Sequence, residues 1–259
     1  MVEDNSARAP YDHFAPVYDE FNAQNNYEIW LGGVLLPELE RRGLQRSNDR
    51  VLDVGCGTGR AFEPLQRRGW AISGCDISQQ MLAIAALKHP DVDLRNASAT
   101  NLPTYCCGNS FDLILALNDV VNYLSGTGDL ELFLEGVTRN LTPGGLVCFD
   151  ANTLGLFKAN WIAGRKSSMS DRGWEWTGLN KDAVAGGIFE AELAGERIQA
   201  HRHLQRHWTR QRIEAALTGA GLQRLGALGM TEDKSGIYLD PTPDESRHLK
   251  TIYIARHDG

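Results

Sequence analysis

The chain has 259 residues, of which 42% are hydrophobic and 23% are charged, as is usual for a soluble globular protein. Its formal net charge of −7 argues against a nucleic-acid-binding surface, which needs clustered cations to neutralise phosphates. No run of residues approaches the roughly 20 apolar residues of a membrane span, and Met1–Asn5 lacks the basic and apolar regions of a signal peptide. The five cysteines have no metal-site spacing. We therefore expect a cytoplasmic protein with free thiols and without a nucleic-acid or membrane partner.

The first half of the chain predicts helices followed by alternating strands and helices. Residues 1–45 have a helical pattern with a row of aromatic side chains between Tyr11 and Trp30. From Arg50 to Ala151, alternation of this kind is typical of a parallel sheet covered by helices on both faces. We predict strands at 50–55, 71–76, 91–96, 111–117 and 145–150, and helices at 59–69, 78–88 and 129–141.

A different pattern follows in residues 154–207. Tryptophan and aliphatic residues alternate there with polar ones, and glycine pairs interrupt them, which indicates antiparallel strands joined by hairpins. A helix at 209–220 and strands near 222–229 and 249–256 come next, the two strands separated by a long exposed loop at 231–247. The predicted fold is α/β, a doubly wound seven-stranded Rossmann-like sheet with an antiparallel β cap insertion. Its parts are an N-terminal helical lid (1–45), a core (46–153 and 208–259) and the cap (154–207).

The most informative motif is a strand that ends in an acid and enters three alternating glycines, Asp53, Gly55, Gly57 and Gly59. A second acid, Asp76, ends the next predicted strand. A turn that admits a ligand to the backbone, followed by a carboxylate one strand over, is how α/β sheets hold adenosine-containing cofactors. A dinucleotide fingerprint has its third glycine one residue later, which disfavours a nicotinamide-dependent oxidoreductase. The structural alternative is a tight turn with two acids that cap helices.

The D-x-G-x-G-x-G form resembles motif I of the class I S-adenosylmethionine-dependent methyltransferases. Segments 77–81, 96–103, 111–118 and 141–145 match further motifs of this family in order, although Ser98 stands where the family commonly has Asp. Residues 11–19 resemble the opening segment of small-molecule methyltransferases, in which a tyrosine on a lid helix folds over the cofactor. The resemblance implies S-adenosylmethionine as cofactor and S-adenosylhomocysteine as product, with the ribose hydroxyls on Asp76. The implied cofactor-binding residues are Tyr11, Tyr18, Trp30, Asp53, Gly55, Cys56, Gly57, Gly59, Arg60, Asp76, Ile77, Met81, Ala97, Ser98, Ala99 and Leu117.

Candidates for the acceptor site come from two segments. Residues 118–124 resemble the same segment of glycine and amino-sugar N-methyltransferases, where the acceptor amine lies near the sulfonium. A carboxylate at Asp119 can steer an ammonium substrate and receive its proton, while a helix N-cap is the alternative for this position. The expected catalytic residues are Asn118, Asp119, His201 and His207, and the expected substrate-binding residues are Asn122, Tyr123, Phe157, Trp161, Trp174 and Trp176. The cap's own core and a homodimer interface are the alternatives for the four cap aromatics. A metal site at positions 201, 203 and 207 is disfavoured because no fourth ligand is apparent.

These features predict a transferase that moves a methyl group from S-adenosylmethionine to a small-molecule acceptor. The resemblance of residues 118–124 favours an amine nitrogen on a natural-product or amino-sugar scaffold, and O-methylation of a hydroxyl on a similar molecule is the alternative. A cofactor-binding sensor that performs no transfer is the non-enzymatic alternative.

Overall fold

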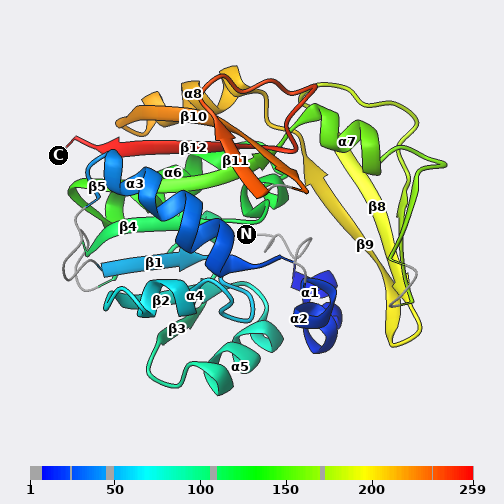
Figure 1. Ribbon diagram of the computed structural model, residues 1–259, viewed down its shortest axis with the longest axis horizontal. Coiled ribbons are helices and arrows are strands. Elements are labelled where there is room, and N and C mark those ends of the chain that lie inside the picture. Colours follow the sequence, from blue (N-terminus) through cyan, green and yellow to red (C-terminus); the bar gives the residue numbers. More distant parts are fainter. Residues whose placement is uncertain are drawn as a thin grey trace.

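Eight strands form one mixed sheet in the part of the chain that the computed structural model describes, which is residues 8–23, 25–44, 50–105, 110–169, 173–234 and 236–258 (Figure 1). The strand order is β11-β10-β12-β5-β4-β1-β2-β3. Strands β1 to β5 are parallel, whereas β12 is antiparallel to β5 and β10 is antiparallel to both β12 and β11. The bounds are β1 Arg50–Val54, β2 Ala71–Asp76, β3 Asp93–Asn96, β4 Phe111–Ala116, β5 Leu141–Asn152, β10 Leu222–Asp233, β11 Gly236–Asp240 and β12 Lys250–His257.

Helices cover both faces of this sheet, as its nearly continuous apolar strands require. In β4, Leu113 and Leu115 point to one face and Ile114 to the other, and all three are fully buried. The Ile114 face packs against α6 (Asp129–Asn140) and α8 (Arg210–Gly219), and the opposite face packs against α3 (Leu36–Arg41), α4 (Phe62–Gln66) and the π-helical segment Glu28–Leu35. Helix α5 (Gln79–Lys88) follows β2 and begins at Ser78, whose hydroxyl accepts the backbone N–H of Met81.

A second sheet of four antiparallel strands stands beside the first (Figure 1). Its strands are β6 (Lys166–Met169), β7 (Trp174–Gly178), β8 (Ile188–Gly195) and β9 (Ile198–Arg206), preceded by α7 (Leu154–Asn160). The N-terminal helices α1 (Arg8–Phe14) and α2 (Tyr18–Phe21) lie between the two sheets in Figure 1. Phe14 and Val17 pack there against Trp174 and Leu193 of the second sheet.

The structure differs from the sequence-based fold in the C-terminal part. The large sheet has eight described strands rather than seven, because part of the predicted loop at 231–247 forms the end of β10 and the hairpin strand β11. Ile237 and Leu239 pack on the core while Tyr238 between them is 48% exposed. This alternation is the signal of a half-buried strand, and the abundance of Asp and Pro in the segment obscured it.

Two other boundaries are also different. The helix predicted at 59–69 is limited to Phe62–Gln66, because Gly59 and Gly69 at its ends have φ angles of 78° and 76°, outside the helical region. The segment from residue 154 begins with helix α7, capped by Thr153, before the predicted antiparallel strands start. Cys106 and Cys107 lie outside the described residues, and Cys56, Cys75 and Cys148 are buried free thiols. Within the described residues, no helix has the length and apolar content needed to cross a membrane.

Candidate functional site

A first cavity lies at the carboxyl ends of β1, β2 and β4, where the strand order of the large sheet reverses. This is the place where open α/β sheets bind ligands. The turn after β1 enters the cavity with Gly55 and Gly57, whose φ angles are 70° and 53°. A Cβ atom at position 55 would lie 2.4 Å from Cγ2 of Val120, so a glycine is required where these two segments meet.

Asp76 at the end of β2 faces the same cavity with both carboxylate oxygens partly engaged. Oδ2 accepts the backbone N–H of Gly57 at 2.8 Å, and Oδ1 accepts that of Ser78 at 2.8 Å. Burial raises the pKa of Asp76 to about 6, although these two backbone hydrogen bonds oppose the rise. Each oxygen has further lone pairs, so the carboxylate can accept hydrogen bonds from a ligand's hydroxyl groups.

Asp53 on β1 is a second buried carboxylate in this cavity. Burial, with the nearby charge of Asp76, raises the pKa of Asp53 to about 8. A ligand with hydroxyl and ammonium groups would stabilise the ionised forms of both carboxylates, because it supplies hydrogen bonds and positive charge in place of the water that burial excludes. S-adenosylmethionine carries both kinds of group, so the residues present fit this cofactor.

The N-terminal segment is tied to the cofactor-side loops by polar contacts. Ser78 Oγ donates to Asp12 at 2.6 Å, and Thr58 Oγ1 donates to Asp19 at 2.5 Å. The guanidinium of Arg60 donates to the carbonyl oxygen of Asn25 at 2.5 Å. These contacts hold the rings of the segment over the first cavity, where Tyr11, Tyr18 and Tyr27 line the wall.

A second cavity of about 410 Å³ adjoins the first, and Tyr11, Tyr18, Asn118 and Tyr123 line both. Its wall is assembled from the N-terminal segment, the turn after β4, the end of β5, helix α7, the second sheet, the β10–β11 hairpin and the segment that leads into β12. The charged residues on this wall are Asp119, Asp150, Glu232 and Lys250, and the rings facing it are those of Tyr11, Phe14, Tyr18, Phe21, Trp30, Tyr123, Trp176 and His203.

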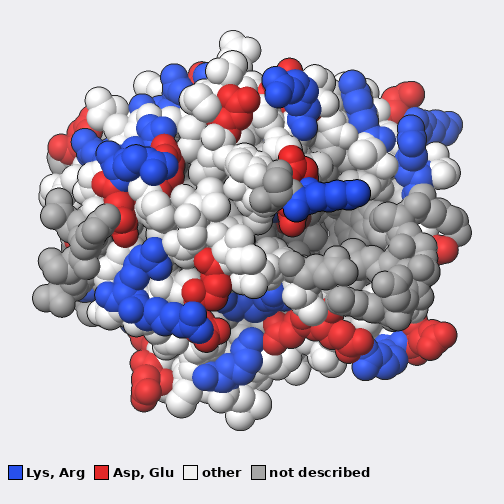
Figure 2. All heavy atoms as spheres, viewed as in Figure 1, with Lys and Arg blue, Asp and Glu red and all other residues white. Residues whose placement is uncertain are grey.

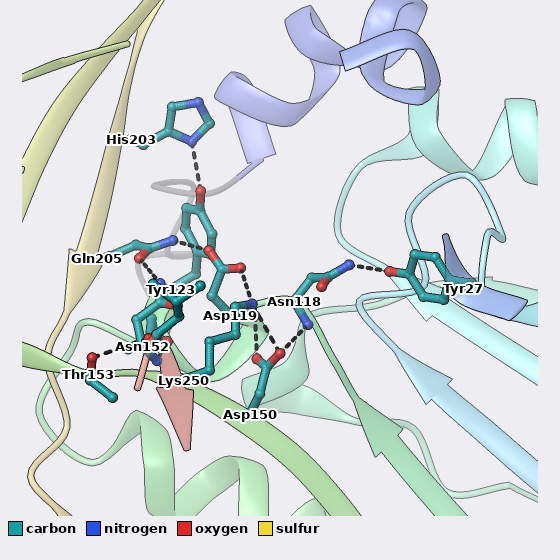
Figure 3. Close-up of polar contacts among 12 residues, drawn as sticks. Tyr27, Asn118, Asp119, Tyr123, Asp150, Asn152, Thr153, His203, Gln205 and Lys250 are labelled. Atoms are coloured by element: carbon teal, nitrogen blue, oxygen red, sulfur yellow. Dashed lines mark hydrogen bonds and ion pairs between the residues drawn. The ribbon is translucent and has the colours of Figure 1, made fainter. Parts of the chain in front are cut away.

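Asn118, just after β4, lines both cavities, and Asp119 beside it lines the second. Figure 3 shows the polar contacts of these two residues. The backbone of both residues is in the left-handed conformation, with φ angles of 60° and 59°. The Asp150 carboxylate accepts both of their backbone N–H groups, at 2.9 and 2.5 Å. Lys250 Nζ lies 3.0 Å from Asp150 Oδ2 and 3.2 Å from Asp119 Oδ1. The amide of Gln205 donates to the other Asp119 oxygen at 2.5 Å, so both oxygens of this carboxylate are held.

A neutral hydrogen-bonded pair closes the wall on the side of the second sheet. Tyr123 Oη and His203 Nδ1 are 2.7 Å apart (Figure 3). Burial lowers the pKa of His203 to about 3, with a smaller contribution from His201. Burial also raises the pKa of Tyr123 above its usual value. At neutral pH, the pair therefore carries no charge.

Of the residues expected around the cofactor, two lie elsewhere. Gly59 faces the opposite side of the turn, where a Cβ atom would lie 2.8 Å from the Phe62 ring, so its role is in packing. Trp30 is 2% exposed and belongs to the core beneath the sheet, at the edge of the second cavity. The other fourteen line the first cavity, namely Tyr11, Tyr18, Asp53, Gly55, Cys56, Gly57, Arg60, Asp76, Ile77, Met81, Ala97, Ser98, Ala99 and Leu117. The Ser98 hydroxyl is engaged with Thr100, whose backbone N–H it accepts at 3.2 Å.

The two histidines expected to act as bases lie outside both cavities. His207 is buried beyond the end of β9, where Nε2 lies 3.0 Å from Glu245 and Nδ1 accepts the N–H of Gly186. His201 packs on Phe14, with Nδ1 3.0 Å from the carbonyl oxygen of Gln199. Neither histidine lines a cavity described above, and His203 takes that place. Within the described residues, no group of three or more His, Cys, Asp or Glu side chains is arranged to hold a metal ion.

The residues expected to bind the acceptor divide into two groups. Tyr123 and Trp176 line the second cavity. Phe157, Trp161 and Trp174 are at most 3% exposed within one chain, so they form packing contacts rather than the pocket wall or a homodimer surface. Asn122 is fully buried and connects Arg206 to Asn152 through its side-chain amide.

Sequence comparison identifies the core. Residues 51–145 match the family of methyltransferase domains. The chain thus carries a methyltransferase domain, and it resembles the S-adenosylmethionine-dependent methyltransferases of class I. A putative methyltransferase from Geobacillus sp. is 31% identical over 147 residues, which cover 55% of this chain and 58% of that protein. A ubiquinone biosynthesis O-methyltransferase from Rhizobium etli is 35% identical over 102 residues, which cover 38% of this chain and 39% of that enzyme. The chain thus spans little more than half the length of the first of these relatives.

Solved structures show the same fold. A methyltransferase from Clostridium acetobutylicum superposes with a TM-score of 0.74 at 22% identity, covering 96% of this chain and 100% of the other. The amino pentose methyltransferase CalS10 from Micromonospora echinaspora has a TM-score of 0.57 at 20% identity, with coverage of 86% and 89%. At these identities the likeness shows the Rossmann-like methyltransferase fold, with a large mixed sheet and a separate antiparallel sheet.

Sequence analysis missed several residues of the site, among them Asp150 and Gln205, which hold the turn after β4. Tyr27 belongs to the predicted aromatic row, and its hydroxyl contacts the side-chain amide of Asn118. His203 lies two residues from an expected histidine. Lys250 is the one charged residue in the apolar run 249–255, which is a signal for a partnered cation in a buried strand. Glu232 lies in the segment that was expected to be a loop.

Proposed function

We propose that the chain transfers a methyl group from S-adenosylmethionine to the amine nitrogen of a small, partly apolar metabolite of the natural-product or amino-sugar type. The observation that carries this proposal is the second cavity, which continues from the first at Asn118 and is acidic and aromatic at once. This cavity is partly open to solvent, and its volume of about 410 Å³ lies within the range of small-molecule sites. Acidic and basic side chains are interspersed over the described part of the face shown in Figure 2, which suits a small acceptor better than a polyanion.

In this proposal the first cavity binds the cofactor, and each of its lining residues has a separate role. Asp76 would accept from the ribose hydroxyls, while Ile77 and Met81 would pack on the adenine ring. Asp53 and the Gly55–Gly57 turn would hold the methionine tail, with Asp53 opposite its ammonium group. When bound, the cofactor supplies an electrophilic methyl group on a sulfonium centre. The contribution of the protein is then to align the acceptor with it, and such positioning can lower a barrier by roughly 7–11 kcal/mol.

The charges of the second cavity favour a cationic acceptor. Asp119, Asp150 and Glu232 bring three carboxylates to the wall, and Lys250 brings one ammonium group, which leaves two uncompensated negative charges when all are ionised. The aromatic rings around them add cation–π attraction for an ammonium group. Burial raises the pKa of Asp119, although Lys250 opposes the rise. A carboxylate with a raised pKa is a better proton acceptor for an ammonium that must expose its lone pair.

O-methylation of a hydroxyl is the second candidate, favoured by the Tyr123–His203 pair. Because His203 is neutral, it can accept a hydrogen bond and orient a phenol or alcohol beside Tyr123. The ubiquinone biosynthesis relative is named an O-methyltransferase. The N-terminal segment would act as the lid and the second sheet as the cap in either reaction, and both would exclude water from the reacting groups.

The deciding experiment gives the pure protein methyl-labelled S-adenosylmethionine with a fractionated extract of small metabolites. Mass spectrometry then locates the label, and we expect it on the nitrogen of one basic compound. Label on oxygen would favour the second candidate. Binding of the cofactor without transfer to any fraction would favour the non-enzymatic sensor.

Asp119→Asn tests the acceptor role of this carboxylate in the same assay. We expect transfer to fall by about 100-fold or more, as for the loss of a general base, while the affinity for S-adenosylhomocysteine changes less than threefold. Asp182→Asn, on an exposed turn of the cap, is the matched control. Equal loss of transfer and cofactor affinity, or no loss of either, would remove Asp119 from this role.

A further inference from the structure

The turn after β4 has two consecutive residues, Asn118 and Asp119, in the left-handed backbone conformation. Among the described residues, Asn118 and Asp119 are the only non-glycine residues with positive φ. Such a conformation is sterically disfavoured for residues other than glycine, although Asn and Asp tolerate it best. It persists only where the surroundings determine it, and here the surroundings are two charged side chains from other strands.

Asp150 supplies the first of these. Its side chain is fully buried on β5, and its two oxygens accept the N–H groups of Asn118 and Asp119 separately. One carboxylate thereby fixes two consecutive peptide units in the orientation that left-handed residues adopt. A buried carboxylate used in this way needs a compensating charge, since an unpaired one is strongly disfavoured in the interior.

Lys250 supplies that charge. It lies at the start of β12, and its ammonium group bridges the carboxylates of Asp150 and Asp119. The pKa of Lys250 is raised by these two carboxylates in spite of its burial. Gln205 of β9 holds the second oxygen of Asp119, so two strands, β9 and β12, hold this side chain, while Asp150 of β5 holds its backbone N–H.

We propose that Asp150 and Lys250 are positioning residues that hold the Asn118–Asp119 turn at the junction of the two cavities and aim the Asp119 carboxylate at the acceptor nitrogen. This inference rests on the amine acceptor proposed above. The positive charge of Lys250 opposes the rise that burial causes in the pKa of Asp119. Without Lys250 this pKa rises further, so the carboxylate that faces the acceptor is protonated at a higher pH than in wild type.

Other titratable and charged groups face Asp119 from the surrounding elements. Tyr11 and Tyr18 approach from the N-terminal segment, Tyr123 from the turn after β4, and Glu232 lies on the same cavity wall. Burial raises the pKa of each of these three tyrosines above its usual value. The phenols therefore remain neutral below pH 9, and Lys250 is the cation that Asp119 faces across this wall.

The test compares Lys250→Met with wild type using two readouts. The first is the amide proton shifts of Asn118 and Asp119 in the NMR spectrum, which report their hydrogen bonds to Asp150 without any acceptor. The second is binding of benzylammonium, against neutral benzyl alcohol, to the protein loaded with S-adenosylhomocysteine between pH 5 and 9. Lys250→Arg is the rescue variant, and Lys181→Met on an exposed turn of the cap is the matched control.

We expect Lys250→Met to shift the amide signals of both Asn118 and Asp119. The affinity for benzylammonium should fall at least tenfold at pH 6, and as the pH is lowered this binding should be lost at a higher pH than in wild type. Benzyl alcohol and S-adenosylhomocysteine should bind within threefold of wild type, and Lys250→Arg should restore most of the loss. Unchanged amide signals would overturn the proposal. Shifted signals with unchanged benzylammonium binding would overturn the aiming of Asp119 and leave a structural ion pair.

The readouts also separate this inference from the proposed function. If wild type shows no preference for benzylammonium over benzyl alcohol, the amine acceptor is contradicted, and with it the aiming of Asp119. The amide signals still decide whether Asp150 and Lys250 hold the turn. A merely destabilised Lys250→Met protein would melt earlier yet retain the pH midpoint of wild type.

Discussion

Asp76 shows how one buried carboxylate can serve the backbone and a ligand together. Its oxygens accept the N–H groups of Gly57 and Ser78, which shapes the glycine turn and starts helix α5. The same oxygens face the first cavity. Because its burial raises its pKa to about 6, additional donors from a ligand would stabilise the ionised form.

Asp76→Ala should therefore lower the affinity for S-adenosylhomocysteine by about 100-fold. Two charged hydrogen bonds to ribose hydroxyls are together worth about 3 kcal/mol, and every 1.4 kcal/mol is tenfold in affinity. Isothermal calorimetry measures the loss, with Asp93→Ala on the exposed side of β3 as control. Affinity within threefold of wild type would remove Asp76 from the ribose role.

Single positions also show why sequence reasoning placed some residues wrongly. The aromatic row was assigned by helical spacing, but Glu28–Leu35 is π-helical. Hydrogen bonds from i to i+5 change the angular spacing of side chains. Trp30 packs in the core at the edge of the second cavity, and Tyr27, just before this segment, lines the first cavity. His201 and His203 both lie on the buried face of β9. Which of them reaches the cavity depends on how the second sheet sits against the first, and no local pattern contains that.

At the scale of elements, the cap combines a packed interior with one functional wall. Phe157 of α7 stacks on Phe189 of β8 at a centroid distance of 4.3 Å, and Trp161 joins them. Trp176 lies at the edge of this cluster, where its ring approaches His203 at 5.1 Å. The aromatic content of the segment thus serves mainly to hold the sheet that presents Trp176 and His203.

Phe157→Ala should destabilise the protein by about 3–5 kcal/mol, the usual cost of emptying a fully buried aromatic site. Urea denaturation measures the loss, and hydrogen exchange should accelerate chiefly in β8 and β9. The affinity for S-adenosylhomocysteine should stay within threefold of wild type. Leu132→Ala on the exposed side of α6 is the control. Equal exchange rates in the variant and wild type would show that Phe157 does not support the cap.

At the scale of the whole molecule, the sequence predicts the parallel half of the sheet well and the site less evenly. Strands β1, β2 and β4 and the glycine turn follow from local periodicity and spacing, so their common edge was predictable, and so was the cavity beside it. The second cavity is assembled from parts of the chain that lie far apart in sequence, from Tyr11 to Lys250. Lys250 meets Asp150 only through the pairing of β12 with β5, 100 residues apart in sequence. Such long-range pairing has no local signature.

Two raised carboxyl pKa values at one sheet edge should make the stability of the ligand-free protein fall as the pH rises. The pKa of Asp53 is about 8 in the folded chain and about 3.9 when unfolded. Between these values the folded chain retains a proton that the unfolded chain has lost. The free energy of unfolding therefore decreases with rising pH across this window, and the contribution is lost above pH 8.

Asp53→Asn removes this titration without adding a charge. The variant should gain stability over wild type progressively from pH 4 to 8, by about 2 kcal/mol at the upper end after allowance for relaxation around the buried group. Urea denaturation at fixed pH values measures the difference, and Asp93→Asn on exposed β3 should run parallel to wild type. Parallel curves for Asp53→Asn would contradict a buried, proton-retaining Asp53. A gain that disappears when S-adenosylhomocysteine is added would agree with the ammonium of its methionine tail lying against this carboxylate, because the ligand then compensates the charge in wild type alone.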